Sequence, residues 1–182
     1  KFIVPCMNTD KICVFTNLGL MHQIKVLDIP AGKFRDKGVP IDNLCNYDSA
    51  KEYIIQVLDV QTMIHSTLLF ATAKSMLKVM DGDLLNASKR TVQATKLSED
   101  ELVAVIVADW SEESEDKVVL QTKDGVFLKF PYAEIPKKKK SALGVRGMKL
   151  SKDDLITNVY VMDAQNISSI MYKEKELEFN RL

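Results

Sequence analysis

Basic side chains gather at three places in this chain, and their types suit the binding of phosphate. Lysine offers a positive charge, and arginine adds paired N–H donors that match phosphate oxygens. A single cluster of this kind is most simply a solvated loop, but three clusters at equivalent places predict one positive stripe for a polyanion. The candidate contacts are Lys33, Arg35, Lys37, Lys89, Arg90, Lys137, Lys138, Lys139, Lys140 and Arg146.

The three clusters occupy the same place in an internal repeat. Each one precedes a short segment that closes on a leucine, and these leucines are Leu44, Leu97 and Leu150. Both intervals are 53 residues (97 − 44 and 150 − 97). Around this frame each repeat has a β-hairpin pattern, the basic cluster, the leucine segment, an acidic turn and another β-rich run. Four short strands in a repeat of about 50 residues are typical of propeller blades.

The predicted fold is therefore all-β, with four-stranded propeller-like blades and no convincing helix. We expect a single domain or fragment over residues 1–182, with repeats at about 11–63, 64–113 and 114–166 and a partial fourth at 167–182. This gives about three blades and the opening hairpin of a fourth. Phe2-Ile3-Val4 is predicted as an incoming strand, and Gly38–Leu44 as the strand that follows the first basic cluster.

Lysines also recur on the second strand of each predicted hairpin, at Lys25, Lys78 and Lys129. They either extend the positive stripe or are simply strand lysines that face solvent. Trp110 borders the acidic loop 109–116, where it is more simply a packing anchor than a platform for stacking on a base.

Glycines near the basic clusters also allow two interpretations. Gly38, Gly144 and Gly147 either let the backbone approach a phosphate closely or fit tight packing and a bulge between blades. Ser75 stands in the second hairpin turn where the other two repeats have glycine. That turn should therefore be of a different type or more strained.

The composition excludes several other classes of protein. Lysine and arginine together number 25, as do aspartate and glutamate, so the formal net charge is zero, and 46% of the residues are hydrophobic. This is the profile of a globular protein rather than of a disordered one. No apolar run approaches the roughly 20 residues that a membrane-spanning helix needs.

Neither a metal site nor a catalytic site is predicted. Cys6, Cys13 and Cys45 are an odd number without metal-ligand spacing, which favours reduced core thiols in a cytosolic protein. His22 and His65 fall at unrelated places in the repeat, without cysteine or carboxylate partners at ligand spacing. No Walker loop, nucleophile motif or recurring acid–base pair is present, so we expect no cofactor.

Taken together, these motifs resemble a known family. Asp10–Gly19, Arg35–Gly38 and Asn43-Leu44 look like one blade of the C-terminal domain of type IIA DNA topoisomerase A subunits. That group comprises the A subunits of gyrase and of its relative topoisomerase IV. Val119–Gly125 resembles the hairpin of a following blade, and Gly144–Leu150 closely resembles the family's Gly-Val-Arg-Gly-Ile-x-Leu segment. The resemblance covers nearly the whole chain.

The resemblance implies a β-pinwheel, a six-bladed propeller variant in which neighbouring blades exchange a strand. It implies that a basic rim, with the ten candidate contacts named above, binds and bends duplex DNA and presents it to the catalytic core for ATP-dependent topology change. The implied partners are duplex DNA, the rest of the topoisomerase A subunit, and the ATPase B subunit, in the cytoplasm at the nucleoid. The family's catalytic tyrosine lies in another domain, so no tyrosine here is given that role.

Three departures from the family pattern leave gyrase against topoisomerase IV open. Lysines fill positions 137–140 where the family often has arginines, and Thr91 stands where the other repeats have glycine. The glutamine-arginine-glycine box of gyrase A subunits would fall before Lys1. Two other functions also stay open: a propeller that binds protein partners without DNA, and a stand-alone relative of the domain.

Overall fold

Short β-strands make up most of the ordered elements. The computed structural model describes residues 2–163 and 169–179. The strands are β1 (Lys11–Thr16), β2 (Leu20–Lys25), β3 (Ile54–Asp59), β4 (Thr67–Thr72), β5 (Met76–Asp81), β6 (Thr91–Gln93), β7 (Leu102–Val107), β8 (Lys117–Thr122), β9 (Phe127–Pro131), β10 (Val145–Arg146), β11 (Ile156–Met162), β12 (Ser169–Tyr172) and β13 (Lys175–Glu178). The other elements of these ranges are α1 (Val60–Ile64) and 3-10 turns at Val26–Asp28, Ile41–Asn43, Gly82–Leu85 and Tyr132–Glu134. The predicted all-β class is confirmed.

The first two blades each take their fourth strand from the next repeat. The first blade has the strand order β3-β1-β2-β6, and the second has β10-β5-β4-β7. β6 follows the second hairpin in sequence yet completes the first blade, and β10 follows the third hairpin yet completes the second. Within the described residues the third blade has three strands, β11-β8-β9, and β12 and β13 form a separate hairpin. A blade is therefore not a contiguous repeat.

The pairing register reproduces the sequence period. Val92 of β6 pairs with Met21 of β2, and Val145 of β10 pairs with Leu77 of β5. Val92 and Val145 are 53 residues apart (145 − 92), whereas their partners Met21 and Leu77 are 56 apart (77 − 21). The 53-residue period thus belongs to the exchanged strands, and the loops absorb the difference.

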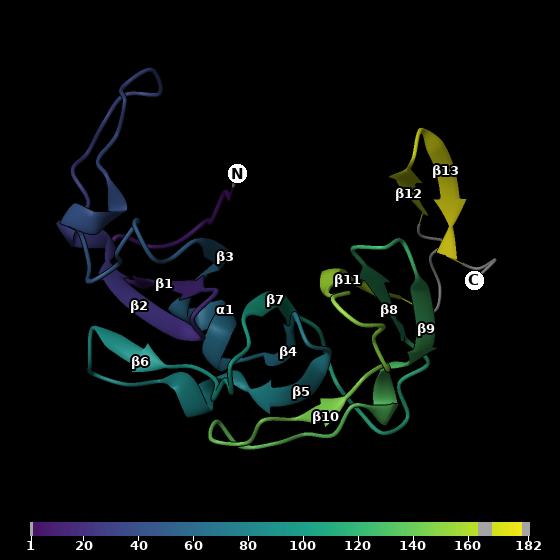
Figure 1. The fold of residues 1–182 in the computed structure, drawn as a ribbon. Coiled ribbons are helices and arrows are strands. Elements are labelled where there is room, and N and C mark those ends of the chain that lie inside the picture. Colours follow the sequence, from purple (N-terminus) through teal and green to yellow (C-terminus); the bar gives the residue numbers. More distant parts are fainter. Residues whose placement is uncertain (1, 164–168, 180–182) are drawn as a thin grey trace.

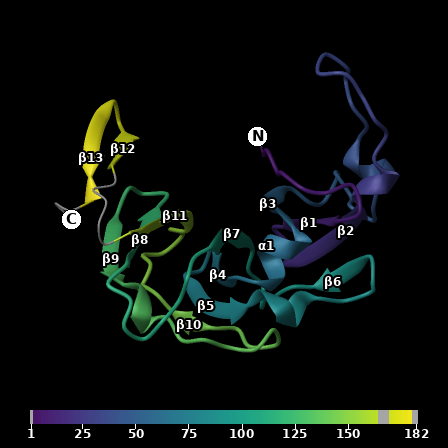
Figure 2. The same cartoon turned by 180° about the vertical axis from the view of Figure 1, so that it is seen from behind.

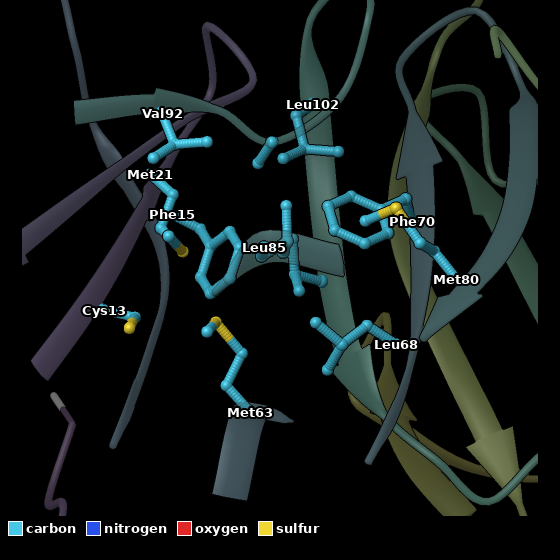
Figure 3. Close-up of a cluster of buried hydrophobic side chains, with 12 residues drawn as sticks. Cys13, Phe15, Met21, Met63, Leu68, Phe70, Met80, Leu85, Val92 and Leu102 are labelled. Atoms are coloured by element: carbon cyan, nitrogen blue, oxygen red, sulfur yellow. The ribbon is translucent and has the colours of Figure 1, made fainter. Parts of the chain in front are cut away.

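Alternation along the central strands builds a separate core on each side of a blade. On β4, Leu68 and Phe70 belong to the core between the first and second blades, and Leu69 and Ala71 belong to the core between the second and third. Successive side chains of a strand face opposite sides of the sheet, so a strand buried on both sides is a continuous apolar run. Figure 3 shows the first core, where Phe70 meets Phe15 edge-on with ring centroids 6.2 Å apart.

The blades follow one another along an open arc (Figures 1 and 2). The first blade, with β1 and β2, lies at one side of the arc, the second blade with β4 and β5 lies at its base, and the third blade with β8 and β9 lies on the other side. The β12–β13 hairpin stands beyond the third blade. Because the sheets face each other through the cores, the connecting loops lie on the border of the arc.

Two local strand predictions are wrong. The segment Gly38–Leu44 contains a 3-10 turn instead of a strand, because no earlier hairpin among the described residues offers it the strand edge that β6 and β10 use. Phe2–Val4 forms no strand. A short helix, α1, starts after Asp59, whose side chain accepts a hydrogen bond of 2.8 Å from the backbone N–H of Thr62. That bond is an N-cap, which supports a helix start.

The second hairpin turn keeps the backbone conformation of the glycine turns. Ser75 has φ +67°, close to +69° at Gly19 and +84° at Gly125. Of the two expected outcomes, strain rather than a change of turn type is therefore the one found. The hydroxyl and carbonyl oxygens of Ser75 accept hydrogen bonds from the N–H groups of Met148 (2.9 Å) and Gly147 (2.8 Å). The turn thus holds the segment that follows β10.

The cysteine prediction is right for two of three residues. Cys13 and Cys45 are buried, but Cys6 is exposed, and all three are free thiols. Burial raises the pKa of the Cys13 thiol to about 12, so it stays protonated and acts as an apolar core residue. Trp110 packs against the core between the second and third blades, in keeping with the packing interpretation.

Candidate nucleic-acid interface

The ten predicted contacts lie on or before the segments that the 53-residue period defines. Nine of the ten side chains are exposed, and Lys140 is half-buried. Lys89 and Arg90 directly precede β6, and the run 137–140 precedes β10, which ends at Arg146. The charged groups predicted from the sequence therefore face solvent, apart from the half-buried Lys140. What fixes their position is the anchoring of the main chain on the neighbouring hairpin.

The second basic segment, which consists of Lys89 and Arg90, is anchored by one glutamine of β2. Gln23 donates side-chain hydrogen bonds to the carbonyl oxygens of Ala87 (2.9 Å) and Lys89 (2.7 Å). Its backbone N–H donates to the carbonyl of Arg90 at 2.7 Å. Three hydrogen bonds from one residue hold the backbone of this turn against the first blade. The side chains of Lys89 and Arg90 are left to face solvent.

The third basic segment, residues 137–140, lies in a loop whose two ends are both fixed on β5. Val79 donates its N–H to the carbonyl of Pro136 at 3.1 Å and accepts from the N–H of Lys138 at 2.8 Å. Two residues along β5, Leu77 pairs with Val145. Residues 138–144 must therefore leave β5 and return to it, which displays their lysines in a compact loop. The ammonium of Lys137 pairs with the Asp81 carboxylate at 2.6 Å, so this lysine is already partly neutralised.

The first basic segment, residues 33–37, has no such anchor on a hairpin among the described residues. Its turn is closed locally, because the Asp36 side chain accepts from the N–H of Lys33 at 2.6 Å and the N–H of Asp36 donates to the carbonyl of Lys33 at 2.9 Å. Residues 31–40 are exposed throughout. This segment extends away from the first blade at the upper left of Figure 1.

The structure brings two further lysines to the second basic segment: Lys25, which the sequence offered as a possible extension of the positive stripe, and Lys11, which it did not. A hollow is lined by Lys11 at the start of β1, Lys25 at the end of β2, and Lys89 and Arg90. Asp28 is the acidic side chain in its lining. Four cationic side chains from three separate segments around one hollow suit an anionic group such as phosphate.

The loop of residues 137–142 is here called the lysine loop. Arg146 belongs to a different group of cations from this loop. It pairs with Met76, at the turn end of β5, three residues from the bridge between Val79 and Lys137. Three residues of strand correspond to about 10 Å. Around Arg146 lie Lys74 and Lys96 in one hollow, and Lys74 and Lys149 in the next. These three lysines were missed, although Lys96 and Lys149 share one position of the 53-residue frame.

Packing explains two of the three glycines. A Cβ on Gly144 would lie 2.4 Å from the carbonyl oxygen of Leu77, and one on Gly147 would lie 2.5 Å from a methyl carbon of the same leucine. Gly144 also has φ +99°, where a side chain is strained. Both glycines therefore let the exchanged segment lie close on β5. Gly38 has φ +74° with open space around it, so the backbone conformation rather than packing favours glycine there.

Lys25, Lys78 and Lys129 lie on the second hairpin strands β2, β5 and β9, as predicted, but at different register positions, and neither predicted surface role fits Lys78. The pairs Phe15–Met21 and Ala71–Leu77 show that Lys78 is equivalent to His22, not to Lys25. Lys25 is exposed and Lys129 is half-buried, donating to the Phe179 carbonyl at 2.9 Å. Lys78 is only 1% exposed and faces neither solvent nor a surface stripe.

His22 forms a buried polar network with the exchanged strand. Its Nε2 lies 2.9 Å from the Glu52 carboxylate, and its Nδ1 lies 3.0 Å from the hydroxyl of Thr91, the first residue of β6. Burial disfavours the charged form of Glu52, but hydrogen bonds from His22 and from the N–H of Asp48 outweigh it and hold the pKa of Glu52 below its ordinary value. The histidine thus has a structural partner on either side.

No cluster of side chains suited to a metal ion occurs among the residues 2–163 and 169–179. Within the same ranges no helix is long and apolar enough to cross a membrane.

The second and third basic segments lie on one border of the arc, and the first stands at its end. In Figures 1 and 2 the turn before β6 and the loop before β10 follow one another on its outer, convex side, and the first segment projects from the end of the arc beyond the first blade. A family described as "DNA gyrase C-terminal domain, beta-propeller" matches residues 10–57, 66–109 and 116–161. The chain belongs to this family. It is thus a C-terminal domain of a type IIA topoisomerase A subunit, and its blades are those of a β-pinwheel.

Curated relatives and solved structures agree with this assignment. The DNA gyrase A subunit of Chlamydia pneumoniae is 31% identical over 159 residues, which cover 85% of this chain and 18% of that protein. The gyrase A subunit of Chlamydia muridarum is 31% identical over 174 residues, covering 92% of this chain and 20% of that protein. The chain therefore spans about a fifth of the length of these relatives.

The fold is shared with solved C-terminal domains. The crystal structure of the C-terminal domain of DNA topoisomerase IV superposes with a TM-score of 0.82 at 23% identity, covering 95% of this chain and 55% of that one. The E. coli ParC C-terminal domain gives a TM-score of 0.74 at 17% identity, covering 95% and 70%. At these identities the likeness establishes the fold alone.

Proposed function

We propose that this gyrase-type C-terminal domain binds duplex DNA along the convex border of its arc and bends it. The observation that supports the proposal is that a basic segment precedes the exchanged strand in the second and third repeats, each time on the convex border, and that a further exposed basic segment stands at the end of the arc (Figure 1). Repetition of one blade geometry places the second and third segments in series, and the first segment extends the row of basic side chains beyond the first blade. Exposed lysines and arginines suit phosphate contacts, which position a duplex without reading its sequence.

Charge separation lets a neutral chain hold a polyanion. The hollow beside Trp110 is lined by Asp81, Asp83 and Asp109, whereas Lys89 and Arg146 line other hollows, and Asp81 at its edge pairs with Lys137 of the third basic segment. A duplex is attracted to the basic border and repelled from the acidic hollow. The field therefore orients the DNA even though the net charge is zero.

A duplex that touches all three segments has to curve around the arc. Smoothly bending 20–30 base pairs by 40–90° costs of order 1–6 kcal/mol, so several phosphate contacts must offset the bend. We infer that in the intact topoisomerase this bent duplex is presented to the catalytic core, with the ATPase B subunit and the rest of the A subunit as partners, in the cytosol. This would serve ATP-dependent change of DNA topology.

Salt dependence tests the proposal against a propeller that binds only proteins. The logarithm of affinity for a 30-base-pair duplex should fall linearly with the logarithm of salt concentration, by about 0.9 for each phosphate neutralised. Two duplexes of unrelated sequence should bind within a few-fold of each other. Fluorescence anisotropy over a series of salt concentrations measures both. Absence of binding at low salt, or affinity that ignores salt, would reject the DNA-binding function.

A further inference from the structure

The lysine loop is wrapped around a buried cation. The loop leaves β5 beside Val79 and returns to it at Leu77, and the residue between these two anchors is Lys78. The Lys78 ammonium donates hydrogen bonds to the carbonyl oxygens of Ala142 (2.8 Å) and Lys140 (2.9 Å), and more weakly to that of Lys139 (3.4 Å). An ammonium has three donors, so these three carbonyls use them all.

Burial makes this arrangement more than an incidental contact. Lys78 is 1% exposed, and its ammonium lies 5.7 Å from the centroid of the Phe70 ring, which supplies a favourable π face. A charged group in such a place is costly unless it is fully hydrogen-bonded. The loop carbonyls are its hydrogen-bond acceptors, so the loop must adopt the conformation that turns three carbonyls inward. The side chains of Lys138 and Lys139 are exposed, and that of Lys140 is half-buried.

The first blade uses the same register position for the same purpose. His22, equivalent to Lys78, holds Thr91 at the start of β6. In both blades a buried polar side chain on the second hairpin strand therefore grips the segment that arrives from the next repeat. The second blade differs in that the gripping group is a cation and the segment contains four consecutive lysines.

We propose that Lys78 is a positioning residue for DNA binding: its ammonium organises the 137–142 loop from within, so that the loop's lysines reach phosphate in a fixed arrangement. Lys78 itself touches no DNA. This inference rests on the proposed DNA-binding function and adds to it a means by which the protein sets the conformation of one contact loop.

Protonation of Lys78 should then matter at mildly alkaline pH. Burial lowers the pKa of Lys78 to about 8. Around it, β4 presents the neutral Phe70 ring, the loop presents its carbonyls and its own lysines, and Asp81 at the end of β5 is paired with Lys137. Loss of the proton removes one of three donors and leaves a loop carbonyl without a partner. The loop should therefore loosen as pH rises from 7 to 9.

The test compares three variants of the whole chain with wild type. Lys78→Met removes the internal cation and keeps the volume, Lys78→Arg keeps a charge that does not titrate, and Lys173→Met removes an exposed lysine near Tyr172 as the matched charge control. Thermal unfolding establishes that each variant folds. Hydrogen exchange at the amides of 138–142 is measured without DNA, and duplex affinity at fixed salt is measured at pH 7 and pH 9.

Lys78→Met should raise amide exchange in the loop but not in the β4–β5 pairing, and should weaken duplex binding about tenfold, equivalent to ~1.4 kcal/mol. Lys173→Met should change binding less than about twofold. Wild type should lose more affinity between pH 7 and 9 than Lys78→Arg does. That difference in pH profile is one that a purely structural lysine would not produce.

The outcomes separate the two proposals. If wild type fails to bind duplex at all, the proposed function is wrong. If wild type binds and Lys78→Met binds equally well, with or without a change in loop exchange, the positioning role is wrong while the proposed function stands. If Lys78→Met does not fold, equal pH dependence in wild type and Lys78→Arg overturns the inference by itself.

Discussion

At the scale of single residues, Gly144 marks the tightest approach between an exchanged strand and its host. Replacing it with alanine places a Cβ 2.4 Å from the Leu77 carbonyl at φ +99°. We expect Gly144→Ala to reduce the free energy of unfolding by more than about 2 kcal/mol, because left-handed strain adds to a clash with backbone. Urea unfolding followed by circular dichroism measures the decrease.

Gly38→Ala is the matched control for this variant. Gly38 also has a positive φ, +74°, but nothing lies within 4 Å of a Cβ built there. Strain alone should cost about 1 kcal/mol. Equal decreases in the two variants would show that contact with Leu77 is not what requires glycine at 144.

Glu52 makes the stability of the first blade depend on pH in the acid range. Its pKa is lowered in the folded chain, so its contribution to stability is complete above the ordinary glutamate pKa of about 4.3 and is lost as pH falls through the lowered value. The urea midpoint of Glu52→Gln should therefore change less between pH 5 and pH 3 than that of wild type. Glu113→Gln, on the exposed acidic loop, should follow wild type. A Glu52→Gln midpoint that falls as steeply as wild type would remove Glu52 from the acid response.

The sequence identified the charged residues but did not predict how deeply each side chain is buried. The types and spacing of the lysines and arginines predicted which ones are exposed, since a basic run before a short strand is rarely buried. Lys78 could not be placed in the same way. β5 is buried on both faces from Leu77 to Met80, and the carbonyls that satisfy the ammonium come from residues more than 60 positions later. Only the fold brings them together.

At the scale of elements, the loop before β10 carries four lysines, and we expect it to contribute a large part of the dependence of duplex affinity on salt concentration. Replacing Lys138, Lys139 and Lys140 with alanine should weaken duplex binding and reduce the salt slope by about 0.9 for each phosphate that the variant no longer neutralises. Lys137→Ala should do less, because its ammonium is already paired with Asp81 at 2.6 Å. Anisotropy titrations at several salt concentrations measure each slope.

The control for the loop is a pair of lysines outside the basic segments. Lys152 is exposed beside an acidic turn, and the Lys173 ammonium lies 5.2 Å from the centroid of the Tyr172 ring. Replacing both with alanine should alter the slope less than the loop variant does. A slope equally sensitive to both sets would mean that scattered charge, rather than the border, binds DNA.

The repeat predicted the elements better than it predicted their partners. A fixed 53-residue interval identified the segments that become β6 and β10, and short turns between apolar runs, two of the three with glycine, identified the hairpins. The same pattern at Gly38–Leu44 gave a wrong strand, because a strand exists only where another edge pairs with it. Arg146 was grouped with the lysine loop for its nearness in sequence, whereas β10 carries it to the side of Lys74 and Lys96.

At the scale of the whole molecule, the arc predicts curvature of the DNA that binds it. Energy transfer between dyes at the two ends of a 30-base-pair duplex should rise when wild type is added. Removing Arg35 and Lys37 together with Lys137–Lys140 should abolish this rise before it abolishes binding, because one remaining cluster holds DNA without curving it. An end-to-end distance that wild type leaves unchanged would contradict wrapping on this chain, even if binding persists.

The exchange of strands also has a consequence for synthesis on the ribosome. A blade of this chain is not finished when its own hairpin has emerged, because Val145 and Arg146 complete the sheet that begins at Thr67. Folding must then trail translation by about one repeat, with the edge of β5 unprotected in the interval. A nascent chain halted after residue 143 should leave that edge open to proteolysis, and one halted after residue 150, allowing for the exit tunnel, should close it.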